Sequence, residues 1–399
     1  MKTILKNCHV IDGKTNDVTP HMNIVIEGDM IIQMSNEPPS IGLEDHVIDC
    51  SNQYVIPGLI DAHVHLMWDG SADDEFVMHH KDDSFIALKS YRNALRTLSL
   101  GITSVRDVGS IHRTIIELRN AIESGLLMGP TVITCGEAIS MTGGHVYHIC
   151  REIDGADEAR KATRQLFKEG ADFIKVMATG GMTTYGEEPG SSQLTKEELQ
   201  AVVEEAHKRN KKVAAHTGGL EGILTCLEAG IDTIEHGIYA NEEALQQMKE
   251  QGTYLIPTLE VYKRLAFDER VPAWVRMKSE KVLEPHRQML ERAIEIGVNI
   301  VTGTDAGSSV TGADAYFDEL LFMHDVGMTP MQVIHASTRV AAECLDLPDR
   351  GVLAEGKKAD LLILPNNPLE NLHLLKSDKM VMKNGKLVDN YPYRRHVSS

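Results

Sequence analysis

Residues 54–65 have the sequence Tyr54-Val-Ile-Pro-Gly-Leu-Ile-Asp-Ala-His63-Val-His65, an apolar run that ends in two histidines. The apolar part, Val55–Ile60, is typical of a buried β-strand. Because side chains alternate between the two faces of a strand, His63 and His65 should point the same way. Two imidazoles at this spacing can share one metal ion, although a single His-x-His pair is often incidental.

After this stretch, buried-looking strands alternate with amphipathic helices as far as residue 345. Some helices carry clear start signals, such as the capping box of Thr195 and Glu198. Eight strands, each followed by a helix, predict an α/β fold with a (β/α)8 barrel of parallel strands. The predicted strands are Val55–Ile60, Thr103–Arg106, Thr131–Cys135, Phe173–Val176, Lys212–Ala215, Thr233–Glu235, Tyr254–Pro257 and Asn299–Gly303. The predicted helices are Ser84–Leu100, Ile115–Ser124, Ala156–Glu169, Thr195–Lys208, Leu220–Ala229, Glu242–Lys249, Trp274–Ile296 and Ala336–Leu345.

Short strands also occupy both ends of the chain, with turn signals between them. Gly28-Asp29 separates two apolar runs near the start and Asn384-Gly385 separates two near the end, so each pair predicts a hairpin. Strand-rich segments that flank one barrel indicate that the two ends meet as a small β-sandwich. The predicted domains are 1–55 as the first part of the sandwich, 56–345 as the barrel and 346–399 as its second part.

The composition is that of an ordinary globular protein. The formal net charge of −18 argues against nucleic acids and anionic membranes as partners, since both are negatively charged. The six cysteines are scattered without a Cys-x-x-Cys pair, which is typical of a reducing compartment. The sequence has no signal-peptide pattern and no apolar run near the roughly 18 residues of a membrane helix. We therefore expect a cytoplasmic protein with a small-molecule or dipeptide substrate, and a homo-oligomer is possible.

Four more residues with ligand-type side chains lie in or after other predicted strands. His216 and His236 close the fifth and sixth strands, Asp305 follows the eighth, and Lys175 lies within the fourth, in the run Phe173–Met177. A histidine on an apolar strand is usually a satisfied core residue, but a lysine among apolar neighbours is costly to bury. Because the carboxyl ends of barrel strands line the active site, five strands that deliver such residues to one face predict a metal site.

This order of residues resembles the amidohydrolase superfamily. The resemblance extends from about Lys6 to Val388, and its motifs are similar to those of the branch that holds Xaa-Pro and Xaa-Arg/Lys dipeptidases, close to imidazolonepropionase. The motifs that carry it are Pro57-Gly-Leu-Ile-Asp61-Ala-His63-Val-His65, Thr103-Ser-Val-Arg106-Asp107-Val-Gly109, Thr142-Gly-Gly-His145, Ile174-Lys175-Val-Met-Ala-Thr-Gly180-Gly181, Ile234-Glu-His236-Gly237 and Gly303-Thr-Asp305-Ala-Gly307.

The resemblance implies a hydrolase with two divalent metal ions. Zinc is expected first, while Mn²⁺, Co²⁺ and Fe²⁺ stay open. N6-carboxylated Lys175, a carbamate formed with CO₂, would bridge the two ions, and burial would supply the neutral amine that CO₂ needs. The other implied ligands divide between the ions: His63, His65 and Asp305 hold the more buried one, and His216 and His236 hold the more exposed one.

The resemblance also implies how the reaction would run. A hydroxide between the metals would be the nucleophile, because coordination brings the pKa of water near neutral. Asp305 would take its proton and pass it to the leaving amine. His145, after the third strand, would polarise the scissile carbonyl. Tyr239 and Tyr262, just past the sixth and seventh strands, are candidates for substrate contact or for packing at the barrel rim.

Three further features bear on the expected site. Arg106 and Asp107 are expected to form a structural pair behind the barrel rim. Gly180–Gln193 is a long Gly-, Thr- and Ser-rich loop, either a lid or a solvated connection. The run Thr217–Gly219 after His216 departs from the dipeptidase relatives, which tend to carry a bulky ring two positions after this histidine. This departure should open the pocket.

The first expectation for function is hydrolysis of an amide C–N bond in a peptide-like substrate, such as a dipeptide or an N-acyl amino acid. The alternative is a cyclic amide or imidazolone ring hydrolase. One-metal deaminases of the superfamily place a glutamate shortly after the strand-five histidine, and Thr217–Leu220 contains none, so a deaminase is less favoured. A non-enzymatic scaffold typically loses metal ligands, and no ligand-type residue is missing here. Metal analysis separates these readings, with about two ions for the hydrolase, about one for a deaminase and none for a scaffold.

Overall fold

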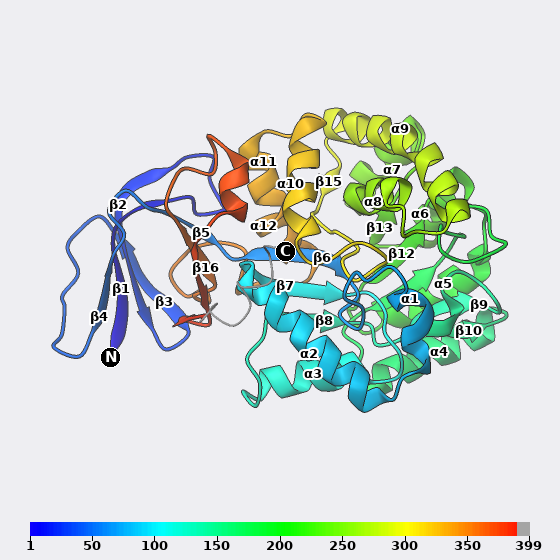
Figure 1. Cartoon of the computed structure of the whole chain (residues 1–399), viewed down its shortest axis with the longest axis horizontal. Helices are drawn as coiled ribbons and strands as arrows, with labels where there is room; N and C mark the ends of the chain where they lie inside the picture. Colours follow the sequence, from blue (N-terminus) through cyan, green and yellow to red (C-terminus); the bar gives the residue numbers. More distant parts are fainter. Residues whose placement is uncertain (389–399) are drawn as a thin grey trace.

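The computed structural model describes residues 1–388, which form a β-sheet unit beside an α/β barrel. Figure 1 shows the sheet unit on the left and the barrel, surrounded by helices, on the right. Two segments far apart in sequence, blue and red-brown in Figure 1, lie together in the sheet unit.

Strands from both ends of the chain share one sheet. Its hydrogen-bonded order is β18-β17-β16-β5-β1-β2-β3, with β4 beside β1. β5 joins the two ends, because it pairs in parallel with β1 and antiparallel with β16. Buried side chains that include Leu5, Ile24, Val55 and Leu361 form the core of this unit. The strands are β1 (Lys2–Val10), β2 (Thr19–Glu27), β3 (Met30–Ser35), β4 (His46–Asp49), β5 (Tyr54–Pro57), β16 (Leu361–Leu364), β17 (Met380–Lys383) and β18 (Lys386–Leu387).

The described residues place these end strands in a single hydrogen-bonded sheet, so the second layer of the expected sandwich stays a prediction. The domain boundaries at residues 55 and 345 also stay predictions. Of the second predicted part, 346–399, residues 389–399 lie outside the described residues.

Parallel strands close into the predicted barrel. Two ladders, β6-β7-β8 and β9-β11-β12-β13-β14-β15, make up most of the ring, and β10 extends the second one. The backbone N–H of Ala62 donates to the carbonyl of Thr302 (3.0 Å), and Asp172 N–H donates to Thr134 (2.8 Å), which joins the ladders at both edges. The strands are β6 (Leu59–Val64), β7 (Ile102–Asp107), β8 (Thr131–Thr134), β9 (Ala138–Met141), β10 (Cys150–Ile153), β11 (Ile174–Met177), β12 (Val213–Thr217), β13 (Thr233–His236), β14 (Tyr254–Ile256) and β15 (Asn299–Ile300).

Helices surround the barrel, and those with strong local signals lie where the sequence predicts them. α4 and α6 match their predicted bounds, and Thr195 forms a capping box with Glu198 at the start of α5. Among residues 1–388, none of the helices combines the length and apolar character that crossing a membrane requires. The helices are α1 (Asp74–Val77), α2 (Asp83–Ser99), α3 (Thr114–Glu123), α4 (Ala156–Glu169), α5 (Lys196–His207), α6 (Leu220–Ala229), α7 (Glu242–Gln251), α8 (Leu259–Phe267), α9 (Ala273–Ile296), α10 (Ala315–Asp325), α11 (Pro330–Ala336) and α12 (Arg339–Cys344).

The first predicted strand, Val55–Ile60, is wrong as a single element. The chain leaves the end sheet after β5 and enters the barrel at β6, with Gly58 between them. A Cβ atom on Gly58 would lie 2.2 Å from the Thr103 hydroxyl oxygen, so only glycine fits this close approach to β7. The apolar run Val55–Ile60 therefore contributes residues to both the end sheet and the barrel.

Other differences follow from weak local signals. β9, which pairs in parallel with β11, and β10, which pairs in parallel with β9, were not expected within the connection after β8. The predicted helix Ala336–Leu345 begins too early. In the structure Ala336 is the last residue of α11, and the next helix, α12, spans Arg339–Cys344. α8 and α10 were also not predicted, although both pack against the barrel.

Candidate active site

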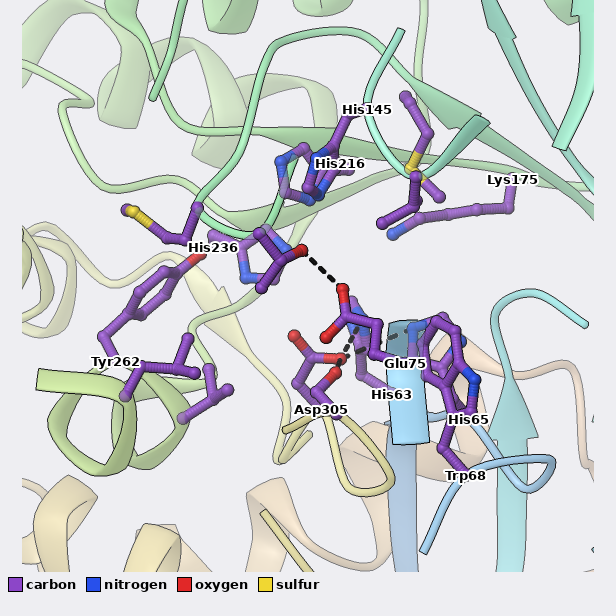
Figure 2. Close-up of a pocket in the computed structure, with 17 residues that line it drawn as sticks. His63, His65, Trp68, Glu75, His145, Lys175, His216, His236, Tyr262 and Asp305 are labelled. Atoms are coloured by element: carbon purple, nitrogen blue, oxygen red, sulfur yellow. Dashed lines mark hydrogen bonds and ion pairs between the residues drawn. The ribbon is translucent and has the colours of Figure 1, made fainter. Parts of the chain in front are cut away.

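A cavity opens beside the carboxyl ends of the barrel strands (Figure 2). Two of the three predicted substrate contacts, His145 and Tyr262, line it. The third, Tyr239, is 39% exposed and lies outside the set of lining residues, so the structure does not bring it into the cavity. The same cavity is lined by all of the predicted metal ligands: His63, His65, Lys175, His216, His236 and Asp305.

The histidines at the end of β6 share one carboxylate oxygen. The Nε2 atoms of His63 and His65 each lie 3.4 Å from Oδ1 of Asp305 (Figure 2). Their other ring nitrogens are occupied, since Nδ1 of His63 lies 2.6 Å from a Glu235 carboxylate oxygen and Nδ1 of His65 lies 2.9 Å from the Gly109 carbonyl. Such outer contacts orient imidazoles for metal binding and leave both Nε2 atoms directed at the cavity.

Glu235 is a positioning residue that the sequence did not reveal. Its second oxygen accepts a hydrogen bond from the Arg106 guanidinium at 2.7 Å, and Arg106 also donates to the Ala62 carbonyl. Burial acts to raise the pKa of Glu235, but Arg106 and Lys175 hold it well below its usual range. Arg106 and Asp107 therefore do not pair with each other, although both are buried and form structural hydrogen bonds. Asp107 instead accepts a hydrogen bond from the Leu66 backbone at 2.7 Å, because β7 turns these neighbours to opposite faces.

Three donors converge closely enough to hold a cation. One ligand atom from each of His63, His236 and Asp305 lies within 4.8 Å of the other two. Burial keeps the pKa of His236 well below its ordinary value, and that of His216 likewise, so both imidazoles have a free lone pair. Burial acts to raise the pKa of Asp305, but His63 holds it well below its usual value, so Asp305 is ionised. Burial acts to lower the pKa of His63 itself, but the Asp305 and Glu235 carboxylates raise it. The neutral imidazoles of His216 and His236 beside an ionised carboxylate suit a divalent ion.

Two buried polar atoms support this fit. Within residues 1–388, neither Nε2 of His236 nor Nζ of Lys175 has a hydrogen-bond partner, although both atoms are buried. Buried polar groups without partners are rare in folded proteins and call for a ligand, an ion or water. Burial is also the main cause that lowers the pKa of Lys175, with Arg106 adding to it. The residues present therefore fit a metal-binding site with a lysine of lowered pKa at one wall.

The backbone is strained at two of these ligands. His236 has a φ of 69° and Asp305 a φ of 60°, both in the left-handed region that side chains other than glycine rarely adopt. Each such residue costs roughly 1–3 kcal/mol and persists where the surrounding structure holds it. The Thr258 hydroxyl helps to hold His236 in this conformation, because it lies 2.7 Å from Nδ1 of the imidazole. Both strained residues are thus predicted metal ligands that line the cavity.

His145 is held over the cavity by the loop Gly180–Gln193. Its Nδ1 lies 3.2 Å from the Thr184 hydroxyl and 3.3 Å from a Glu187 carboxylate oxygen. Burial acts to raise the pKa of Glu187, but the contact with His145 lowers it below its ordinary value. A Cβ atom on Gly181 would lie 2.3 Å from the His145 ring, so glycine is needed where the ring crosses the loop.

We expect Gly181→Ala to reduce turnover by displacing the His145 ring. Loss of one oxyanion donor typically lowers kcat by about 10²–10³-fold, and a displaced ring should give part of this loss. The measurement is kcat of the metal-loaded variant, with its metal content as a check on the rest of the site.

The control is the same substitution in a His145→Ala background. The nearest atoms to the added methyl all belong to His145, so Gly181→Ala should have little further effect once that ring is gone. An equal loss of turnover in both backgrounds would show that Gly181 does not act through His145.

The sequence also missed several residues that line the cavity. Glu75 lies on the short helix α1, and Trp68 lies in the segment that leads to it. Met182 and Thr183 come from the loop after β11. These segments have no regular periodicity, so no sequence pattern marks their side chains as part of the site.

Comparisons with known proteins agree with this geometry. The chain is 31% identical over 370 residues to ochratoxinase from Aspergillus niger, an alignment that covers 84% of this chain and 75% of that one. A solved Xaa-Pro dipeptidase with bound methionine in its active site is 33% identical, with a TM-score of 0.90 and coverage of 98% of this chain and 100% of the other. Imidazolonepropionase from Symbiobacterium thermophilum is 22% identical over 351 residues, or 81% of this chain and 77% of that one. The profile of the amidohydrolase family matches residues 54–388, and the chain belongs to this family.

Proposed function

We propose that this protein is a binuclear metal-dependent hydrolase that cleaves the amide C–N bond of a small peptide-like substrate, a dipeptide or an N-acyl amino acid. One observation carries the proposal: neutral imidazoles, an ionised carboxylate and an unpaired buried lysine meet in one cavity at the carboxyl ends of the barrel strands. The Xaa-Pro dipeptidase and its bound methionine support a peptide-like substrate.

We assign the residues present to two ions, for which zinc is our first choice. Lys175, as its N6-carboxylated form, would lie between them and convert a costly buried amine into an anionic ligand. Bound divalent ions would acidify the attacking water and polarise the amide carbonyl. The remaining ligands fall into two sets: His63, His65 and Asp305 for the more buried ion, and His216 and His236 for the more exposed one.

The chain's own groups account for the proton transfers. Asp305 is ionised and lies in the cavity, so it can accept the proton of the attacking water and return it to the leaving amine. When both ring nitrogens of His145 carry protons, Nδ1 donates to the Glu187 carboxylate and the opposite nitrogen can donate to the substrate carbonyl oxygen. Tyr262, buried beside His236, would form the wall against which the substrate packs.

A cyclic amide or imidazolone substrate is the second candidate, and the likeness to imidazolonepropionase favours it. The two classes are separated by assaying metal-loaded enzyme on dipeptides, N-acyl amino acids and cyclic amides. We expect turnover of open-chain amides and about two metal ions per chain. Turnover confined to ring amides would favour the second candidate, and an absence of bound metal would contradict both.

The partners and cellular location are also proposals. We propose a small-molecule or dipeptide substrate, and the net charge of −18 argues against nucleic acid or an anionic membrane surface as a partner. The scattered free cysteines, of which five are buried, support the proposed cytoplasmic location, and a homo-oligomer stays a proposal.

A further inference from the structure

Glu75 is a buried acid in the cavity that the proposed metal chemistry does not use. It lies on α1, is 3% exposed and points toward the ligand cluster (Figure 2). The hydroxyl of Thr183 donates to one carboxylate oxygen, and the hydroxyl of Ser309 lies 3.3 Å from the other. The converging ligand atoms belong instead to His63, His236 and Asp305.

The carboxylate of Glu75 is poorly compensated. Among the residues described, its side-chain hydrogen bonds come from hydroxyl groups, and no lysine or arginine forms an ion pair with it. Burial is the main cause that raises the pKa of Glu75; Thr183 and His145 act to lower it, and the nearby charge of Asp305 adds to the rise. A cation placed beside this carboxylate would offset the cost of burying it.

The rest of the cavity indicates where such a cation would lie on the substrate. Met182, Val261, Leu265 and Tyr262 form an apolar wall. Apart from Lys175, no lysine or arginine of the described chain lines the cavity, so a substrate carboxylate finds no free cationic side chain there. This combination suits an amino acid residue with an apolar side chain and a free ammonium group.

We propose that Glu75 binds the protonated α-amine of the residue on the acyl side of the scissile amide. The enzyme is then selective for substrates with a free, apolar N-terminal residue and discriminates against N-acyl amino acids, which lack the amine. Glu75 is a specificity-determining residue in this scheme. The inference rests on the proposed amide hydrolysis and selects between its two substrate classes.

The first test compares two substrates that differ only in the ammonium group, leucyl-alanine and 4-methylpentanoyl-alanine. A hydrogen bond to a charged group is worth about a 10- to 100-fold change in affinity. We therefore expect wild-type kcat/KM to be at least about 10-fold higher for leucyl-alanine than for 4-methylpentanoyl-alanine. Glu75→Gln keeps the shape of the side chain and should lose most of this preference. Its kcat/KM should fall for leucyl-alanine and change little for the other substrate.

The control variant is Glu188→Gln, which removes an exposed carboxylate from the loop Gly180–Gln193 and should keep the wild-type preference. Metal content is measured in parallel. Loss of metal from Glu75→Gln would make Glu75 a metal ligand and overturn the proposal, as would equal turnover of both substrates by the wild-type enzyme.

A second readout does not depend on turnover. L-Leucine should raise the melting temperature of the wild-type protein more than 4-methylpentanoate does, and Glu75→Gln should remove this difference. If no amide is hydrolysed but leucine still binds in a Glu75-dependent way, the proposed function fails while the amine site stands. If amides are hydrolysed and neither readout responds to the ammonium group, the amine site is wrong and the hydrolase assignment stands.

Discussion

Lys175→Ala is expected to purify with at most about one metal ion per chain and to have very low activity. If the carboxylated lysine bridges two ions, its loss removes one anionic ligand from each. The two cations then face each other with less negative charge between them, and their repulsion favours loss of the more exposed ion, held by His216 and His236. The deciding measurement is metal stoichiometry by elemental analysis, together with a high-resolution view of the end of the Lys175 side chain.

An ordinary buried lysine would behave differently. Its replacement would leave metal content unchanged and would cost little stability, because the Lys175 amine has no hydrogen-bond partner to lose among residues 1–388. Two tightly held metals in Lys175→Ala, or an unmodified Lys175 in a fully metallated active enzyme, would falsify the proposed bridge.

Rescue experiments sharpen this prediction. Short carboxylic acids should partly restore activity to Lys175→Ala, because a free carboxylate can occupy the space of the missing carbamate. Bicarbonate should aid metal reconstitution of the wild-type apoprotein but should not rescue the variant, which has no amine to carboxylate. Lys212→Ala is the matched control. Lys212 directly precedes β12, at the end of the strand opposite to His216, and donates to the Cys344 carbonyl at 2.8 Å. Its replacement should therefore leave metal content at the wild-type level.

Asp305→Asn is expected to keep the fold and to lose about 10²–10⁴-fold in kcat, the usual cost of removing a general base. Asparagine is the suitable replacement because Asp305 has a φ of 60°, and asparagine tolerates this left-handed conformation better than most residues. The amide keeps the shape of the side chain but cannot accept the proton, and it binds a metal more weakly.

The measurements are kcat, thermal stability and metal content of the same preparation. Asp314→Asn, which removes a carboxylate outside the cavity that pairs with Arg96, should retain wild-type turnover. Near-wild-type kcat in fully metallated Asp305→Asn would remove Asp305 from the mechanism.

The sequence alone determined the barrel and the set of ligand-type residues at its mouth. Each of these residues lies in or directly after an apolar strand, and the alternation of side chains along a strand sets which face it occupies. Because the carboxyl ends of parallel barrel strands meet at one mouth, local position was enough to bring His63, Lys175, His236 and Asp305 together. The bounds of α4 were predictable for a similar local reason, since Gly170 ends that helix in the left-handed conformation.

The tertiary structure decided what surrounds these residues. Arg106 and Glu235 lie 129 positions apart, and only barrel closure places the guanidinium against the carboxylate that orients His63. Glu75 comes from a helix of four residues, too short for a periodic pattern, and it reaches the cavity through contacts with Thr183 and Ser309 from distant loops. Hydrophobic period and capping act over a few neighbouring residues, whereas charge pairing and cavity shape depend on contacts between distant segments. The proposed metal ligands were therefore readable in the sequence, and the residue that we propose to select the substrate was not.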